Sequence, residues 1–398
     1  MMNFLYDLSA TQPSPQSKFH GGGEYGEVVF FKLLEFKDKV NLFCYYDSSS
    51  YLNPDIISVL KEKNIPLFDI QKKSLKEIIQ ENKIDRAYSA MLNLNQNWPL
   101  GELELYTTVH GLRTVEMPLD SIIFDYEKKL KDKIRSLLFM TVLKKWYLKK
   151  LKVINGRLVT DNRINVITIS NHSLASINSF YPETAGKEIP VFASPTFLQL
   201  DNYSPVKNSL PETKLADYGI KPKKYFLITS AARWTKNALR AIRAFDSLVS
   251  DGLLQDYSLA VTGVTNQALF LPHIKNKETI RLLGYVEREE LELLNKNAYA
   301  FIYPSLNEGF GYPPVDSMHF KVPVMASGTS SIPEVCGNAA LYFDPYSESE
   351  IRNRIIQLLN PEIYTDLQEK SVAQHDYISK KQKKDLQLLA EYLIAQEK

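Results

Sequence analysis

The sequence predicts an α/β protein with two domains, each built around an open parallel sheet. Short apolar runs alternate with amphipathic stretches along the 398 residues, which is the pattern of repeated strand–helix–strand units. A polar segment with several prolines, Pro205 to Pro222, interrupts the alternation, and we interpret it as a linker. A chain of this length holds enough apolar material for two cores.

The elements follow from the apolar runs and their punctuation. In the first half, strands are expected at residues 3–9, 40–46, 85–89, 103–109, 164–169 and 190–193. After a Pro/Ser-rich loop, the glycines 21–23 open a helix that is expected to continue to Phe36. In the second half, strands are expected at residues 225–229, 258–262, 279–283, 300–303 and 322–326. The tail from about Pro361 is expected to be helical to its end.

Composition excludes several classes of protein. Hydrophobic residues make up 44% of the chain and charged residues 24%, which is ordinary for a soluble globular protein. The net charge of +2 gives no sign of a nucleic-acid partner. Two distant cysteines, Cys44 and Cys336, favour a reducing cytosol over a disulfide framework. The first residues do not resemble a signal peptide and no apolar run is long enough for a membrane span, so we expect a cytoplasmic protein.

The strongest chemical signal lies between Tyr303 and Asp316, in Tyr-Pro-Ser-Leu-Asn-Glu-Gly-Phe-Gly-Tyr-Pro-Pro-Val-Asp. An apolar strand, a glycine turn and a helix that begins at two prolines succeed one another there. This arrangement holds anions, because free N–H groups and the helix dipole point at the turn. Two acids, Glu308 and Asp316, flank the turn, and carboxylates beside a phosphate need hydroxyl partners. The combination of phosphate and hydroxyls indicates a nucleotide sugar.

These residues resemble the donor-site motif of the retaining glycosyltransferases of family 4. That family has the GT-B fold, in which two Rossmann-like domains face each other across a donor-binding cleft. Its motif is Glu, seven residues and Glu around a Gly-Phe-Gly turn, whereas the second acid here is Asp316. The resemblance extends upstream to Arg281 and downstream to Pro345. It implies an acceptor-side domain over residues 1–205, a donor domain over 206–372, and a C-terminal helix, 373–398, that crosses back to the first domain.

The resemblance also implies roles for residues of the second half. Glu308 would accept hydrogen bonds from the sugar, and Asp316 from the ribose. The base would bind backbone near Val286, and the rest of the donor would bind the turn formed by Gly309, Phe310 and Gly311.

The loop from Ala231 to Asn237 carries two cations, Arg233 and Lys236. Cations beside a helix N-terminus are unfavourable unless an anion lies between them. The alternative is that the two cations lie on a solvated surface and bind no ligand. In the family, an Arg and a Lys from this loop neutralise the leaving diphosphate. Arg233 lies closer to the Lys than in many members of the family.

Three residues of the first half are also candidates. Gly22 and Gly23 follow a strand and precede a helix, where backbone can approach a phosphate closely, although glycine clusters also form plain loops. The family places a glycine turn there, facing the donor pyrophosphate. His110 ends a strand and matches a family position that contacts the transferred sugar, although Gly111 replaces the Asp that often follows. Further along, Ser170 is expected to be only a helix N-cap.

Residues 127–157 are strongly basic, with eleven Lys and Arg against two acids. As one helix they would have an apolar side and a basic rim, which suits an anionic membrane surface. A helix that packs on the first domain and exposes a cationic face is the alternative.

The sequence thus predicts a hexosyl-type, retaining transferase that moves a sugar from a nucleotide-diphosphate donor to a hydroxyl. The acceptor would be a glycan or a lipid-linked molecule of cell-surface polysaccharide synthesis. A nucleotide-sugar epimerase of the same fold and a non-catalytic membrane-bound scaffold are the alternatives. No cofactor is expected, and the absence of an Asp-x-Asp triplet argues against a metal ion.

Overall fold

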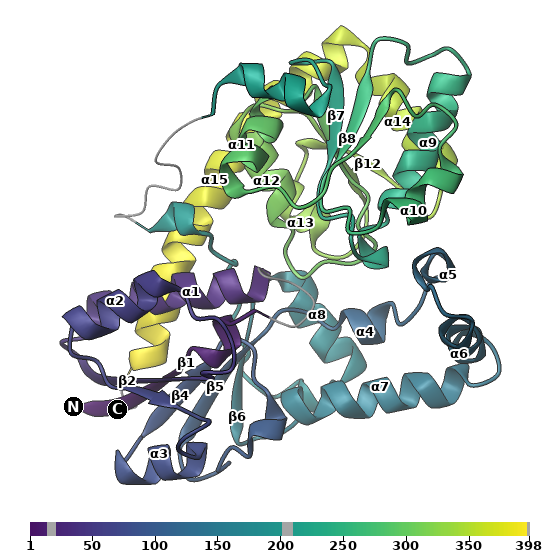
Figure 1. Ribbon diagram of the computed structural model, residues 1–398. Coiled ribbons are helices and arrows are strands. Elements are labelled where there is room, and N and C mark those ends of the chain that lie inside the picture. Colours follow the sequence, from purple (N-terminus) through teal and green to yellow (C-terminus); the bar gives the residue numbers. More distant parts are fainter. Residues whose placement is uncertain (14–20, 201–209, 396–398) are drawn as a thin grey trace. The chain divides into compact units, whose positions relative to one another are not determined.

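The computed structural model describes residues 1–13, 21–200 and 210–395 (Figure 1). The chain divides into two compact units. Unit 1 comprises Met1–Leu112, Lys152–Pro205 and Ser379–Lys398, and unit 2 comprises Arg113–Leu151 and Val206–Ile378. The sequence-based division placed all of residues 1–205 in the first domain, whereas residues 113–151 group with unit 2.

Unit 1 is built on a six-stranded parallel sheet with strand order β3-β2-β1-β4-β5-β6. The strands are β1 (Met2–Asp7), β2 (Val40–Tyr46), β3 (Leu67–Asp69), β4 (Arg86–Ser89), β5 (Glu104–Val109) and β6 (Ile164–Thr168). The central strands are buried on both faces, so they lack the apolar–polar alternation of a half-exposed strand.

The helices of unit 1 lie in the connections between its strands. They are α1 (Gly21–Leu33), α2 (Pro54–Glu62), α3 (Leu75–Glu81) and α8 (Asn171–Phe180). Figure 1 shows α1 and α2 on one side of this sheet and α3 on the other. Right-handed crossovers explain this, because the chain moves outward from β1 to β3 and then returns across the sheet to β4. Ser170 caps α8 by accepting from the Ser173 N–H, as predicted.

Unit 2 repeats the architecture with strand order β12-β11-β10-β7-β8-β9. Its strands are β7 (Tyr225–Ile228), β8 (Ser258–Val261), β9 (Ile280–Leu282), β10 (Ala300–Tyr303), β11 (Val324–Ser327) and β12 (Ala340–Phe343). Helices pack against them: α9 (Ala238–Ser250), α10 (Gln267–Phe270), α11 (Arg288–Asn297), α12 (Tyr312–His319), α13 (Ile332–Cys336) and α14 (Glu348–Leu358). Buried apolar residues of strands and helices form two core clusters within this unit.

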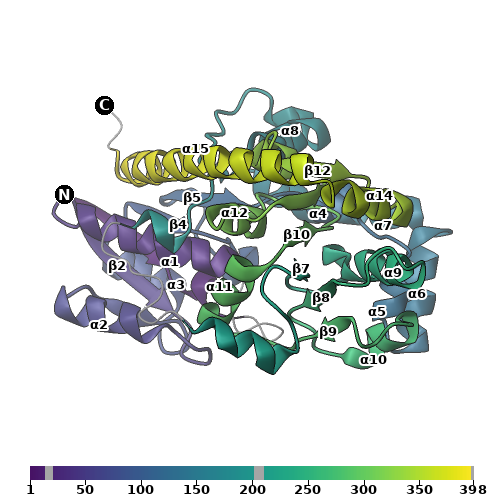
Figure 2. The same cartoon turned by 90° about the horizontal axis from the view of Figure 1, so that it is seen from above.

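The C-terminal tail forms a single helix, α15 (Pro361–Ile394), which is uninterrupted in Figure 2. Its first part belongs to unit 2, whereas residues from Ser379 onward belong to unit 1. There Asp385 accepts from the Ala193 N–H at 2.8 Å, and the Gln382 amide donates to the Ser194 carbonyl at 2.7 Å.

Some elements differ from the sequence-based expectations. Residues 190–193 contribute a single bridge, between Thr168 and Val191, rather than a strand. The edge strands β3 and β12 were not predicted; β3 has only three residues, whereas β12 is an apolar run as long as that of β10 and was missed. The expected linker lies partly outside the described residues, but Glu212–Tyr218 forms a 3-10 helix whose Leu215 is buried in a core of unit 2.

The basic segment was expected to be one helix, and this is wrong. It contains two longer helices, α6 (Leu130–Met140) and α7 (Lys144–Val159), which follow the short helices α4 (Arg113–Glu116) and α5 (Ile123–Tyr126). α6 ends at Thr141, whose φ of −119° and ψ of −99° are not helical. The two helices contact each other through stacked rings of Phe139 and Tyr147, 4.3 Å between centroids.

Candidate active site

The best-defined candidate site lies where the strand order of unit 2 reverses. β7 and β10 are neighbours at the centre of the sheet, and the chain proceeds from β7 to one edge and from β10 to the other. Ligands of open α/β sheets bind beyond the carboxyl ends of such strands. The loop after β7 carries Arg233 and Lys236, and the loop after β10 carries Glu308.

The two loops meet in a buried ion pair. Lys236 Nζ lies 2.6 Å from Glu308 Oε1, with side chains only 8% and 15% exposed. The Ser305 hydroxyl donates to the same carboxylate oxygen. Lys236 Nζ also lies 3.4 Å from the Tyr303 hydroxyl and 5.4 Å from the centre of that ring. Sequence reasoning had assigned both charges to the site, and the structure brings them into contact.

Burial and charge compete in setting the pKa of each group. Burial alone would raise the pKa of Glu308, but the ammonium of Lys236 and the Ser305 hydroxyl hold it below its usual value. Burial lowers the pKa of Lys236, and Glu308 offsets only part of that effect because Arg233 and Arg113 are also near. Glu308 is therefore ionised at neutral pH, surrounded by more than one cation.

Backbone contacts fix the geometry of the two loops. Asn237 adopts a left-handed conformation with φ 56°, and its side-chain amide donates to the carbonyls of Pro304 and Pro345 at 3.0 and 2.7 Å. The Leu306 N–H donates to the Thr235 carbonyl at 2.9 Å, which joins the loop of β10 to that of β7. The Glu308 N–H donates to the Ser330 hydroxyl.

The glycine turn leads into α12 as predicted. Gly311 has φ 104°, a conformation that a residue with a side chain adopts only with strain. Prolines occupy the first turn of α12. Phe310 is buried, and the Ser331 hydroxyl oxygen lies 2.9 Å from the carbonyl oxygens of both Glu308 and Phe310, so it can donate to either.

The remaining candidates of unit 2 are less enclosed. Arg233 is exposed, whereas Gly309 and Asp316, the latter on α12, are half-buried. Val286 packs against one of the two core clusters.

Sequence reasoning missed Arg113, a third cation of the site. Burial lowers the pKa of this guanidinium, the carboxylate of Glu308 partly counters that effect, and Arg233 adds to it. The signal that could have found it is its place three residues after the candidate His110.

The candidates of unit 1 form their own neighbourhood. A Cβ atom on Gly22 would lie 2.3 Å from the Met91 sulfur, so this glycine permits close packing after β4. Gly23 is buried at the start of α1. The His110 Nε2 lies 2.9 Å from the Ala90 carbonyl, and its ring meets that of Tyr25, on α1, edge to face at 4.8 Å. The end of β5 and the glycine-rich start of α1 are therefore neighbours.

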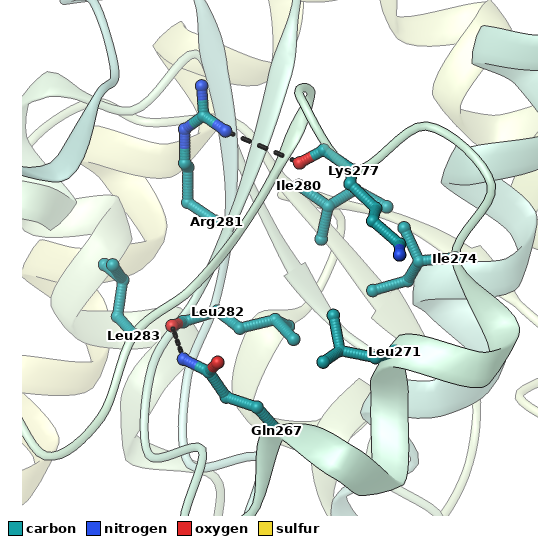
Figure 3. A pocket seen from close by; sticks show the side chains of 8 residues that line it. All are labelled: Gln267, Leu271, Ile274, Lys277, Ile280, Arg281, Leu282 and Leu283. Carbon is teal, nitrogen blue, oxygen red and sulfur yellow. Dashed lines mark hydrogen bonds between the residues drawn. The ribbon is translucent and has the colours of Figure 1, made fainter.

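A separate open pocket lies beside β9 (Figure 3). It is lined mainly by apolar side chains, and Gln267 donates to the Leu282 carbonyl within it. None of the sequence-predicted site residues lines this pocket.

Neither a metal site nor a membrane-spanning helix is found among the described residues. Among residues 1–13, 21–200 and 210–395, no group of three or more His, Cys, Asp or Glu is placed to hold a metal ion. Within the same ranges, no helix combines the length and apolar character needed to cross a membrane.

Residues 212–377, which contain β7 to α14 and the Lys236–Glu308 pair, match the sequence profile of the family described as glycosyl transferases group 1. The match covers residues 212–377, which is less than half of the chain. The match confirms the resemblance of the Glu308 stretch to a glycosyltransferase family, and two solved structures confirm the GT-B fold. WaaG, a glycosyltransferase involved in lipopolysaccharide biosynthesis, has a TM-score of 0.64 at 12% identity, over 98% of this chain and 99% of its own. HepE of Anabaena, solved with UDP and glucose, gives 0.63 at 14% identity over 100% of both chains.

Two bacterial glycosyltransferases are similar in sequence over shorter stretches. The O-antigen chain mannosyltransferase B of Escherichia coli is 42% identical over 88 residues, which is 22% of this chain and 23% of the relative. The O-antigen chain mannosyltransferase RfbU of Salmonella typhimurium is 31% identical over 140 residues, 34% of this chain and 38% of the relative. The chain therefore matches well under half the length of either relative.

Proposed function

We propose that this protein is a retaining glycosyltransferase of cell-surface polysaccharide synthesis. It would transfer a hexosyl group from a nucleotide-diphosphate sugar to a hydroxyl of a glycan or lipid-linked acceptor. The observation that carries the proposal is the buried Lys236–Glu308 pair at the centre of the unit 2 sheet. The bacterial relatives named O-antigen chain mannosyltransferases, and a structural neighbour solved with UDP and glucose, support the same substrate class.

Stabilisation of the departing diphosphate is the main catalytic task that we assign to this site. Negative charge on the leaving oxygen grows as the glycosidic bond breaks, so cations held in place lower the barrier. Lys236 is suited to this role because the ion pair and the Tyr303 ring fix its ammonium in a largely buried position. Exposed Arg233 would approach the diphosphate from the same loop.

Glu308 is proposed to accept hydrogen bonds from the transferred sugar. Its carboxylate remains ionised, and only one of its oxygens bonds to Lys236 and Ser305. Charge-assisted bonds to hydroxyls are stronger than neutral ones, and they orient the anomeric carbon.

The other candidates complete the donor and acceptor sites in this proposal. Asp316 accepts from the ribose, backbone near Val286 binds the base, and the turn from Gly309 to Gly311 contacts the rest of the donor. In unit 1, Gly22 and Gly23 approach the diphosphate, and His110 contacts the sugar.

The reaction is proposed to need no cofactor and no divalent ion, because protein cations supply the positive charge. The nucleotide-diphosphate sugar is a co-substrate.

We also propose peripheral attachment to the cytoplasmic face of a membrane through the basic hairpin, α6 and α7 with the residues between them. Large apolar side chains are exposed there beside exposed lysines, and these side chains include Leu130 at 73%, Val142 at 82% and Trp146 at 54%. In α6 only Ser136 is buried, so this helix does not have the apolar packing face that a solvated structural helix would need. Exposed apolar groups beside lysines suit the interface of an anionic bilayer.

The decisive experiment is a nucleotide-sugar assay with and without acceptors. Purified protein is incubated with UDP-, GDP-, ADP- and dTDP-sugars, alone and with polyprenyl-linked or soluble glycan acceptors. A transferase forms a glycosylated product only when acceptor is present, and NMR of the product gives the anomeric configuration. Conversion of a donor sugar without acceptor would instead identify an epimerase, and no reaction with any donor would favour a scaffold.

A further inference from the structure

We propose that Arg113 is a third diphosphate-binding cation, which acts together with Arg233 and Lys236. This inference rests on the proposed function, since it deepens the same site. All three residues belong to unit 2, although Arg113 comes from α4 and the other two come from the loop after β7. We call Arg113, Arg233 and Lys236 the cation cluster.

The cation cluster carries more positive charge than Glu308 alone balances. Arg113, Arg233 and Lys236 lie close enough to interact electrostatically, and Glu308 is an anion that interacts with Lys236 and Arg113. Of these cations, Lys236 forms the direct ion pair with Glu308. Three positive charges against one negative charge leave a local excess of two, which matches a dianionic ligand.

The guanidinium of Arg113 is available to a ligand. Among the residues that the structure describes, Arg113 donates no side-chain hydrogen bond and forms no ion pair. Its side chain is nevertheless half-buried, so its donors are shielded from water without protein partners. A guanidinium with unused donors can bind phosphate oxygens in a bidentate manner, which an ammonium cannot do.

Two contacts made by the residues that follow Arg113 hold this segment near the loops of the site. Glu116, at the other end of α4, accepts a hydrogen bond from Asn307, the residue before Glu308. Asp120 pairs with Arg240 at 2.9 Å, and Arg240 donates to Asn237, the residue after Lys236. These hydrogen bonds and the ion pair connect the segment that begins at Arg113 to the loop after β10 and to the loop after β7. These ties explain why residues 113–126 group with unit 2.

A purely structural role for Arg113 predicts a different energetic result. The surroundings disfavour the charged form of Arg113, because burial and Arg233 outweigh the attraction of Glu308. Replacement by a neutral side chain of similar size should consequently not destabilise the unliganded protein. Replacement of a ligand-binding residue weakens ligand binding by the protein, whereas replacement of a structural residue lowers the stability of the protein.

The experiment measures binding of inorganic pyrophosphate and of UDP, GDP, ADP and dTDP by calorimetry, with thermal unfolding of the unliganded proteins alongside. The variants are Arg113→Met, Arg113→Lys and Lys236→Met. Arg135→Met is the matched control, because it removes one exposed positive charge from the same part of unit 2, on α6.

We expect Arg113→Met to weaken pyrophosphate binding at least about tenfold without lowering the melting temperature, and Arg113→Lys to restore part of the affinity. Arg135→Met should bind as wild type does. Wild-type affinity in Arg113→Met, with weakened binding in Lys236→Met, would overturn the inference and leave the proposed function intact. A large drop in the melting temperature of Arg113→Met would also overturn it, in favour of a structural role. Failure of wild type to bind any diphosphate would instead remove the proposed function itself.

Discussion

At the scale of single residues, the site depends on one carboxylate among several cations. Glu308 is the anion for Lys236, Arg113 lies near both, and Arg233 lies near Lys236. Removal of the carboxylate charge and removal of the ammonium are therefore not equivalent changes. The first leaves Lys236 and its neighbouring arginines without this anion, whereas the second leaves Glu308 with Ser305 and Arg113 nearby.

We predict that Glu308→Gln lowers turnover by about 10- to 150-fold, because charge-assisted hydrogen bonds are worth about 1.5–3 kcal/mol. We also predict a loss of roughly 1–3 kcal/mol in the free energy of unfolding, because buried Lys236 loses its counter-ion. Added pyrophosphate should raise the melting temperature of this variant more than that of wild type.

Urea unfolding and steady-state assays measure both effects. Lys236→Met should be destabilised less than Glu308→Gln while losing turnover. The exposed pair Lys370–Asp366, 2.6 Å apart, supplies the controls: Lys370→Met and Asp366→Asn should each change stability by less than about 0.5 kcal/mol. Wild-type turnover in Glu308→Gln would contradict the assignment of this residue.

A second residue-scale prediction concerns Glu27 of α1. Burial raises the pKa of this carboxyl from 4.5 to about 7, and the amide of Asn53 donates to it at 3.0 Å. Between pH 4.5 and about 7, the folded protein binds more protons here than the unfolded chain does. The free energy of unfolding should therefore fall as the pH rises through this interval.

Glu27→Gln should flatten this pH dependence and stabilise the protein above pH 7 by on the order of 1 kcal/mol, because Gln still accepts from Asn53 and carries no charge. Urea unfolding at a series of pH values measures the effect. Glu62→Gln, at an exposed site on α2, is the control that should retain the wild-type profile. Parallel profiles for wild type and Glu27→Gln would show that Glu27 titrates normally.

At the scale of elements, the basic hairpin stands out because few of its residues are buried, namely Ser136 of α6 and Gly156 and Val159 of α7. The Phe139–Tyr147 stack joins the two helices, and the Lys150 ammonium lies 5.2 Å from the centre of the Trp146 ring. Near the other end of α7, the Tyr181 hydroxyl donates to the Lys152 carbonyl at 2.8 Å. α7 is thus attached at that end, while Val142 and Trp146 remain exposed.

We predict that replacement of Lys144, Lys145, Lys149 and Lys150 by Gln abolishes co-sedimentation with anionic vesicles. Each cation near such a surface contributes on the order of 1 kcal/mol, and salt should weaken binding because charges beyond about 8 Å are screened. The variant should stay folded and act normally on a soluble acceptor.

The matched control removes the same charge elsewhere, at exposed lysines of unit 1: Lys37, Lys61, Lys72 and Lys76 to Gln. That control should still sediment with vesicles. Val142→Ser should weaken binding without changing its salt dependence, since it removes apolar contact alone. If wild type does not bind anionic vesicles even at low salt, the hairpin is a solvated face.

At the scale of the whole molecule, two six-stranded parallel sheets each bring a set of loops to the carboxyl ends of their strands. The positive charge proposed for the reaction comes from side chains of unit 2. We accordingly predict that excess EDTA leaves the transfer rate unchanged within error, and that added Mg²⁺ or Mn²⁺ does not raise it more than about twofold. A rate that falls with EDTA and returns with a divalent ion would refute the metal-independent mechanism. EDTA treatment of a known metal-dependent glycosyltransferase is the positive control.

Local signals sufficed for much of the fold and for the charged residues of the site. Buried strands such as β10 are apolar runs, Gly311 needs a left-handed backbone, and two prolines begin α12. Each of these features depends on neighbours within a few residues, so the sequence contains them. The basic segment was recognised by composition, but its division into α6 and α7 was not, because the break at Thr141 carries neither Gly nor Pro.

Only the tertiary structure decided which charges meet. Strand order places β7 beside β10, although 71 residues lie between Ile228, the end of β7, and Ala300, the start of β10, and so brings Lys236 to Glu308. It also places Arg113 with these residues, through contacts of Glu116 and Asp120 to loops far along the chain. The sequence by itself determined the residue types and the turns, because these follow from local backbone and side-chain chemistry. The cation cluster depends on long-range packing, which no short stretch of sequence specifies.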